Sequence, residues 1–73
     1  MQNEMKMRYP ANVYPLDVIQ RAIADYRHIC LISYKISKAE TVCYFRNSVT
    51  DLTRTVQEFS NYLIELINSG GGM

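Results

Sequence analysis

The 73-residue sequence has no tryptophan, a single histidine and only two cysteines. Two cysteines are too few for the disulfide framework that stabilises many small secreted domains. The three glycines all lie at positions 70 to 72, so the chain has no glycine-rich phosphate-binding loop. No hydrophobic run approaches the roughly 18 to 20 apolar residues of a membrane span. These absences argue against a disulfide-stapled, nucleotide-binding or membrane-spanning protein.

The sequence also lacks a strong charge of either sign. Its formal net charge is +1, which gives no general attraction to nucleic acid or to anionic lipid. The first nine residues include Glu4, Lys6 and Arg8 and have no apolar segment of the kind found in signal peptides. We therefore expect a cytoplasmic protein with no membrane partner.

Hydrophobic residues, by contrast, are abundant at 48% of the chain, including six tyrosines. That content is enough for a packed core and too high for a disordered chain. A chain of this length forms one domain, near the lower limit for folding without disulfides or metal. We expect a single α+β domain over residues 1–73, with an ordered core at about 5–69 and a flexible tail at 70–73.

Hydrophobic periodicity predicts five elements. Alternation of apolar and polar residues predicts strands at 5–9, 29–36 and 41–46, with Pro10 ending the first. Apolar residues at helical spacing predict one helix at 15–27 and another whose stripe runs from Leu52 to Leu66. Pro15 suits the first position of the first helix, and Ser48 or Thr50 suits the cap of the second.

The turn at 37–40 joins the second and third strands, and its length sets their register. An even-numbered loop pairs Ile36 with Thr41, Tyr34 with Cys43 and Ile32 with Phe45; an odd loop would move Phe45 into solvent. We therefore expect the even register. The inner face is then Cys30, Ile32, Tyr34, Ile36, Cys43 and Phe45, and the outer face is Leu31, Ser33, Lys35, Val42, Tyr44 and Arg46.

The order β-α-β-β-α predicts a two-layer sandwich, with two helices on one face of a three-stranded antiparallel sheet. A right-handed crossover and a hairpin give the strand order 1-3-2, a ferredoxin-like unit without its final strand. The first strand then has an open edge. We expect a second copy, in a homodimer, or another partner to cover this edge.

The residues that could support catalysis are few. His28 follows the first helix, where a capping or surface role competes with the role of a ligand or proton carrier. Cys30 lies two residues later, but Cys43 pairs with Tyr34, so the three do not converge on a metal site. No base is placed to activate a nucleophile. We expect no enzymatic activity, no metal and no cofactor, with a thiol enzyme using Cys30 or Cys43 as the least favoured reading.

The predicted outer face mixes apolar, aromatic and cationic side chains, which is typical of a protein interface. A non-enzymatic accessory subunit that binds a protein or peptide is therefore the preferred function. The alternative is a small nucleic-acid-binding domain in which Lys35, Tyr44 and Arg46 contact single strands. We expect the protein partner rather than nucleic acid.

Two segments resemble a known family. Residues 14–22, which begin Tyr14-Pro15-Leu16-Asp17, are similar to the opening helix of the HxsD family, small components of His-Xaa-Ser peptide-maturation systems. Residues 58–64 are similar to that family's signature of Glu-Phe, an Asn two residues later and a pair of aliphatic residues. The resemblance covers most of residues 9–68.

The resemblance implies a subunit that works beside radical S-adenosylmethionine enzymes, which modify a repeat-containing peptide. The iron–sulfur chemistry would belong to the partner, since this chain lacks three closely spaced cysteines. Within the signature, Asn61 either bonds a nearby loop or contacts a partner. Glu58 and Tyr62 share one edge of the helix with it and complete the candidate interface.

Overall fold

The structure, a computed structural model, describes residues 4–69. The predicted order of elements is confirmed, and the tail predicted at 70–73 lies outside the described residues. The elements are strand β1 (Glu4–Pro10), helix α1 (Leu16–Asp25), strand β2 (Leu31–Ile36), strand β3 (Glu40–Arg46) and helix α2 (Leu52–Asn68).

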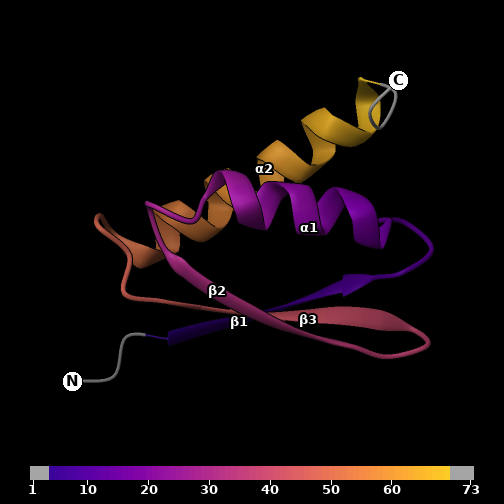
Figure 1. Cartoon of the computed structure of the whole chain (residues 1–73), viewed down its shortest axis with the longest axis horizontal. Helices are drawn as coiled ribbons and strands as arrows, with labels where there is room; N and C mark the ends of the chain where they lie inside the picture. The colour runs from indigo at the N-terminus through magenta and orange to yellow at the C-terminus, as the bar shows by residue number, and fades with distance from the viewer. Residues whose placement is uncertain (1–3, 70–73) are drawn as a thin grey trace.

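The three strands form one antiparallel sheet in the order β1-β3-β2. Both helices lie on the same side of this sheet and make a two-layer sandwich (Figure 1). The α+β prediction is confirmed, and the arrangement is consistent with a ferredoxin-like unit that lacks a final strand. Because β3 is central, β1 and β2 each have an edge without a strand partner among residues 4–69. The sequence predicts the open edge of β1; the open edge of β2 is an additional feature of the structure.

The predicted register of the β2–β3 hairpin is confirmed. Ile32 pairs with Phe45, and Tyr34 pairs with Cys43. Ile36 pairs with Thr41, as the even loop requires. The two sets of side chains therefore lie on the faces predicted from the sequence.

The helices bury the inner face fully on the central strand and only partly on the edge strand β2. Cys43 and Phe45 on the central strand are fully buried, whereas Ile32 and Tyr34 on the edge strand are half-buried. Ile36 is 59% exposed, so its expected place in the core is wrong. It is the last residue of β2, where the chain leaves the sheet for the turn.

Phe59 of α2 lies at the centre of the core. Its ring is fully buried and contacts the ring of Phe45 edge to face, with centroids 5.1 Å apart. The rings of Tyr26 and Tyr9 lie 5.3 Å and 6.2 Å from it. One side chain thus connects both helices with two strands.

The boundaries of α1 and β2 differ from the prediction. Pro15 is extended, with φ −60° and ψ 143°, and precedes α1 instead of occupying its first position. The helix ends at Asp25 rather than residue 27, and β2 begins at Leu31 rather than residue 29. The reason is a tight turn in which the amides of Ile29 and Cys30 both donate to the carbonyl of Tyr26.

The cap of α2 is Asp51, not Ser48 or Thr50 as predicted. The Asp51 carboxylate accepts a hydrogen bond from the amide of Arg54 at 3.0 Å. Ser48 instead forms a hydroxyl pair with Thr55 at 2.7 Å. Asn47, at φ 54°, adopts the left-handed conformation that turns the chain from β3 toward this cap. Between residues 4 and 69, no helix has the length and apolar character needed to cross a membrane.

Candidate protein-interaction surface

The side of the sheet away from the helices is called the outer face here. The register places its side chains in rows that cross all three strands. Lys6, Tyr44 and Ser33 form the middle row, since Tyr44 is paired with both of the others. The flanking rows are Glu4, Arg46 and Leu31 on one side and Arg8, Val42 and Lys35 on the other.

The outer face mixes apolar, cationic and other polar side chains. Tyr44 and Val42 on the central strand are half-buried, and Leu31 is 49% exposed. The lysine and arginine side chains around them are exposed. All six sheet residues predicted as interface therefore lie on one surface that no described element covers.

Most of the cations on this face have no acidic partner. Arg8 forms an ion pair with Glu40 at 2.7 Å. Within residues 4–69, no ion pair involves Lys6, Lys35 or Arg46. Lys6 lies directly opposite Tyr44, whereas Lys35 faces Val42 and Arg46 faces Glu4. Three of the four cations on the outer face thus have no ion-pair partner among residues 4–69.

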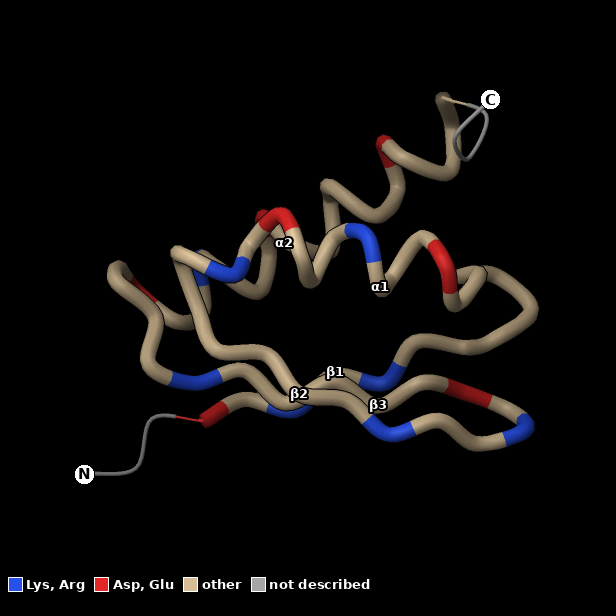
Figure 2. Tube along the Cα trace, in the orientation of Figure 1, with Lys and Arg blue, Asp and Glu red and all other residues tan. Residues whose placement is uncertain are grey.

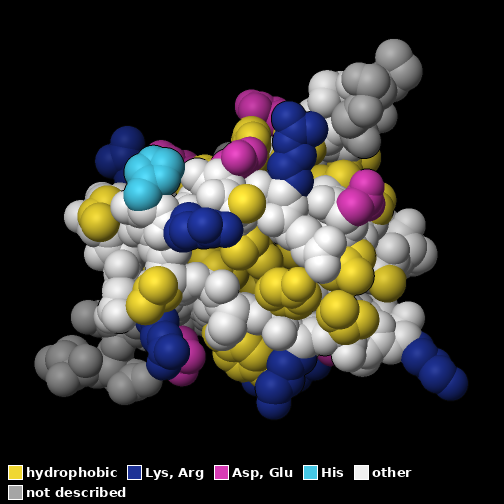
Figure 3. Space-filling model, viewed as in Figure 1, with side chains coloured by type: hydrophobic (Ala, Val, Ile, Leu, Met, Phe, Trp, Pro, Cys, Tyr) yellow, Lys and Arg dark blue, Asp and Glu magenta, His cyan; other side chains and the backbone are white. Residues whose placement is uncertain are grey.

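The two layers of the sandwich carry opposite charge. The sheet layer, residues 4–10 and 31–46, has five cationic and two acidic side chains, a net charge of +3. The rest of the described chain, which carries the helices, has three cationic and five acidic side chains, a net charge of −2. Figure 2 shows this division along the trace, and Figure 3 shows cationic side chains along the margin of the sheet. The small net charge of the chain conceals this asymmetry.

Three residues of β1 missed by the sequence prediction belong to the outer face. Glu4, Lys6 and Arg8 are brought beside the outer-face residues of β3 by the pairing of β1 with β3. Their alternation with Met5, Met7 and Tyr9 is visible in the sequence. It identifies the strand but not the strand's neighbour.

The predicted interface residues of α2 lie elsewhere. Glu58, Asn61 and Tyr62 belong to the helical layer, on the opposite side of the sheet from the outer face (Figure 1). The nine predicted residues therefore form two separate groups. A single flat partner surface cannot contact both.

Two of the three α2 residues have partners within the chain. Glu58 pairs with Arg54 at 3.5 Å, and both side chains are largely exposed. The hydroxyl of Tyr62 donates to the carboxylate of Asp25 at 2.5 Å and so joins α2 to α1. This hydrogen bond raises the pKa of Tyr62. Asn61 is exposed, and its side chain makes no hydrogen bond to other described residues.

The two thiols are buried and poorly suited to nucleophilic chemistry. Burial raises the pKa of Cys43 to about 11. Burial also raises the pKa of Cys30, whose thiol donates to the carbonyl of Arg46 at 3.2 Å. Since the thiolate is the reactive form, both groups are largely unreactive at neutral pH. His28 is exposed, and residues 4–69 contain no group of three His, Cys, Asp or Glu side chains that could hold a metal ion.

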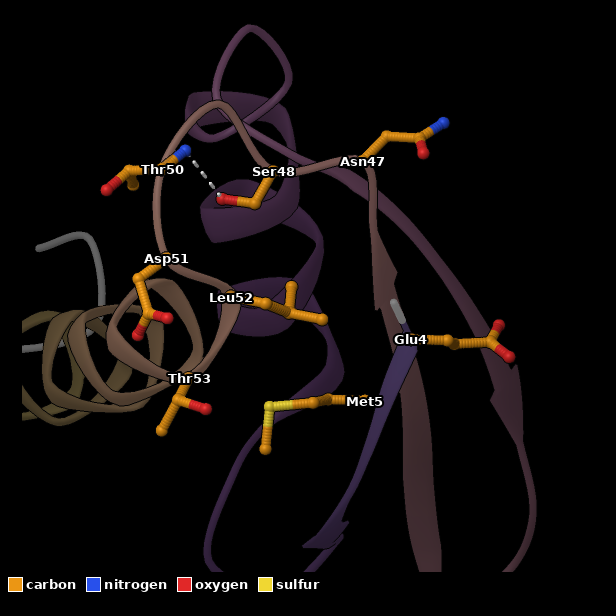
Figure 4. A pocket seen from close by; sticks show the side chains of 8 residues that line it. All are labelled: Glu4, Met5, Asn47, Ser48, Thr50, Asp51, Leu52 and Thr53. Carbon is orange, nitrogen blue, oxygen red and sulfur yellow. Dashed lines mark hydrogen bonds between the residues drawn. The ribbon is translucent and has the colours of Figure 1, made fainter. Parts of the chain in front are cut away.

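A hollow of about 650 Å³ opens between the start of β1 and the start of α2. The side chains of Met5 and Leu52 extend into it, and Ser48 accepts a hydrogen bond from the amide of Thr50 at its rim (Figure 4). Asp51 already caps the helix next to the hollow. Its described side chains include no group of three His, Cys, Asp or Glu that could hold a metal ion.

Comparison with known proteins identifies no relative: no family model, no curated protein and no solved structure matches the chain.

Proposed function

We propose that this chain is a non-enzymatic accessory subunit that binds another protein through the outer face of its sheet. The observation that carries the proposal is that Lys6, Lys35 and Arg46, which form no ion pair within residues 4–69, share the outer face with the half-buried ring of Tyr44. Aromatic and arginine side chains contribute most strongly to protein interfaces, particularly where they can be desolvated together.

Charge indicates what kind of surface the partner presents. A partner with carboxylates around an apolar centre complements the outer face, because its charges would lie opposite the three cations. The acidic helical layer would repel the same partner. The partner is therefore expected to bind on the sheet side and in one orientation.

The resemblance of residues 14–22 and 58–64 to the HxsD family supports a more specific partner. In this proposal the partner is a radical S-adenosylmethionine enzyme, and the peptide that it modifies is rich in His-Xaa-Ser repeats. The chain would work in the cytoplasm, whose reducing conditions preserve the free thiols of Cys30 and Cys43.

Affinity capture from the native host tests the proposal. The parent chain and the variants Tyr44→Ala and Arg46→Ala are each used as bait, with Arg54→Ala on the exposed surface of α2 as the matched control. We expect the same partner with the parent and the control and its loss with both outer-face variants. Equal recovery with all four baits would contradict the proposal.

Nucleic-acid binding is the second candidate, favoured by the position of Lys6 directly opposite Tyr44. This pairing adds a third cation to the predicted set of Lys35, Tyr44 and Arg46. Against it, the neighbours of Tyr44 on the outer face include Leu31 and Val42 rather than further rings for base stacking. Binding of polyuridylate that weakens steeply with salt and is lost in Tyr44→Ala would favour this candidate.

A further inference from the structure

The free edge of β2 carries more exposed apolar surface than the free edge of β1. Among residues 4–69, β2 is hydrogen-bonded on one side only, to β3. Leu31 and Ile36 at its ends are 49% and 59% exposed, and Ile32 and Tyr34 between them are half-buried. Hydrophobic side chains are visible between the layers on the side of α1 and β2 (Figure 3). An edge strand of this kind is a template for pairing with another chain.

The edge of β1 brings like charges opposite one another when it pairs with a second copy of the chain. Two β1 strands that pair antiparallel, with all helices on one side, must place outer-face residues opposite outer-face residues. In the registers with the greatest overlap, Lys6 faces Lys6, Lys6 faces Arg8, or Arg8 faces Arg8, and only the first of these also places opposite charges, Glu4 and Arg8, face to face. Like charges directly opposite one another destabilise a sheet. A register shifted by one residue turns the second copy over. Lys6 and Arg8 then lie on the same side of the sheet as the helices of the partner.

The edge of β2 has no such conflict. In a register centred on Ser33, Ser33 faces its own copy and Ile32 faces Tyr34. In a register centred on Tyr34, Ile32 faces Ile36 and Ser33 faces Lys35. Both registers pair apolar residues on the helical side, and neither places two cations opposite one another. Cross-strand apolar and aromatic pairs of this kind stabilise a sheet.

We propose that a second copy of this chain pairs antiparallel with β2, in one of these two registers, and forms a six-stranded sheet with the helices of both copies on one side. The two outer faces then join into one basic, partly apolar surface. This pairing does not depend on the proposed function, because a single copy can also bind a partner through its outer face.

Sedimentation of the full chain, over a concentration series reaching about 1 mM, tests this pairing. The test variant is Ser33→Lys, in which the new lysine faces its own copy or Lys35. Ser33 is exposed, so the variant should keep the parent's circular dichroism and melting curve. The matched control is Lys6→Ser, at a position on β1 that is also exposed.

We expect the parent to dimerise, Ser33→Lys to raise the dissociation constant about tenfold or more, and Lys6→Ser to leave it within about twofold. Amide exchange should slow in β2, not β1, as the dimer forms. A parent that stays monomeric throughout, or a dimer that Ser33→Lys does not weaken, would overturn the proposal. A monomer whose outer face still captures a partner would overturn this pairing alone and leave the proposed function intact.

Discussion

The hydroxyl groups of Tyr9 and Ser60 lie 2.8 Å apart and form a hydrogen bond between β1 and α2. Tyr9 is almost fully buried, and burial raises the pKa of its hydroxyl to about 12. The bond therefore satisfies a polar group that the core would otherwise leave without a partner. It also fixes the first strand beneath the last helix.

Loss of this hydrogen bond should cost more when the tyrosine hydroxyl is left behind. Ser60→Ala leaves the buried hydroxyl of Tyr9 unsatisfied, which costs about 1–3 kcal/mol of unfolding free energy. Tyr9→Phe removes that hydroxyl and should cost about 1 kcal/mol or less. Urea unfolding of both single variants and the double variant measures the difference. Equal losses in the two single variants would show that the bond is not the relevant contact.

Phe59→Ala should be the most destabilising single substitution in the chain. Removal of a fully buried ring that contacts three other aromatic rings should cost about 3–5 kcal/mol, close to the whole stability of a domain this small. Ile64→Ala, at a residue on the same helix that is 44% exposed, is the control. Thermal melting followed by circular dichroism should show a large fall only for Phe59→Ala. Similar melting of both variants would place the buried face of α2 elsewhere.

The cap at Asp51 should contribute measurably to stability. Asp51→Ala removes the carboxylate that accepts from the amide of Arg54, and an N-cap of this type is worth about 1 kcal/mol. Thr50→Ala changes the adjacent exposed residue without removing a cap and should have little effect. The two variants are compared by urea unfolding. If Thr50→Ala proved the more harmful, Thr50 would be the functional cap.

Alkaline pH should destabilise the protein partly through Cys43. Burial raises the pKa of this thiol from its ordinary value of 9.0 to about 11. The unfolded state therefore releases the proton at lower pH than the folded state. The contribution is fully present below pH 9 and falls between pH 9 and pH 11, by at most about 1 kcal/mol per pH unit.

Cys43→Ala isolates this contribution. The variant should be less stable at every pH because it leaves a cavity, but its stability should fall less steeply between pH 9 and pH 11 than that of the parent. The remaining slope includes contributions from Cys30, Tyr9, Tyr26 and Tyr62, whose pKa values are also raised in the folded state. Urea unfolding across this pH range gives both curves. Parallel curves would mean that Cys43 does not titrate differently in the folded state.

The sheet was predictable because its pattern is local. Alternation in each strand and the length of one turn were sufficient to pair Tyr34 with Cys43. The end of the first helix was not predictable in the same way. Tyr26 continues the helical apolar spacing, but its carbonyl accepts two turn amides that the spacing does not reveal.

The candidate surface was only partly predictable. The outer-face residues of β2 and β3 follow from the hairpin, whereas Lys6 joins them only through a pairing between distant strands. The sequence predicts Tyr62 at one edge of the second helix, as part of the candidate interface. Its actual partner, Asp25, lies 37 residues away in the sequence and is found only by the packing of α2 against α1. The N-cap of α2 is likewise set by the turn at Asn47. This turn brings Asp51, rather than Ser48 or Thr50, to the start of the helix.

Site-specific photo-crosslinking in the native host tests the central claim most directly. A photoreactive residue replaces Ser33 on the outer face or, in a matched sample, Gln57 on the exposed surface of α2. The account predicts covalent adducts with a protein other than this chain from position 33 and none from position 57. Adducts of that kind from position 57 alone would contradict it and move the interface to the helical layer.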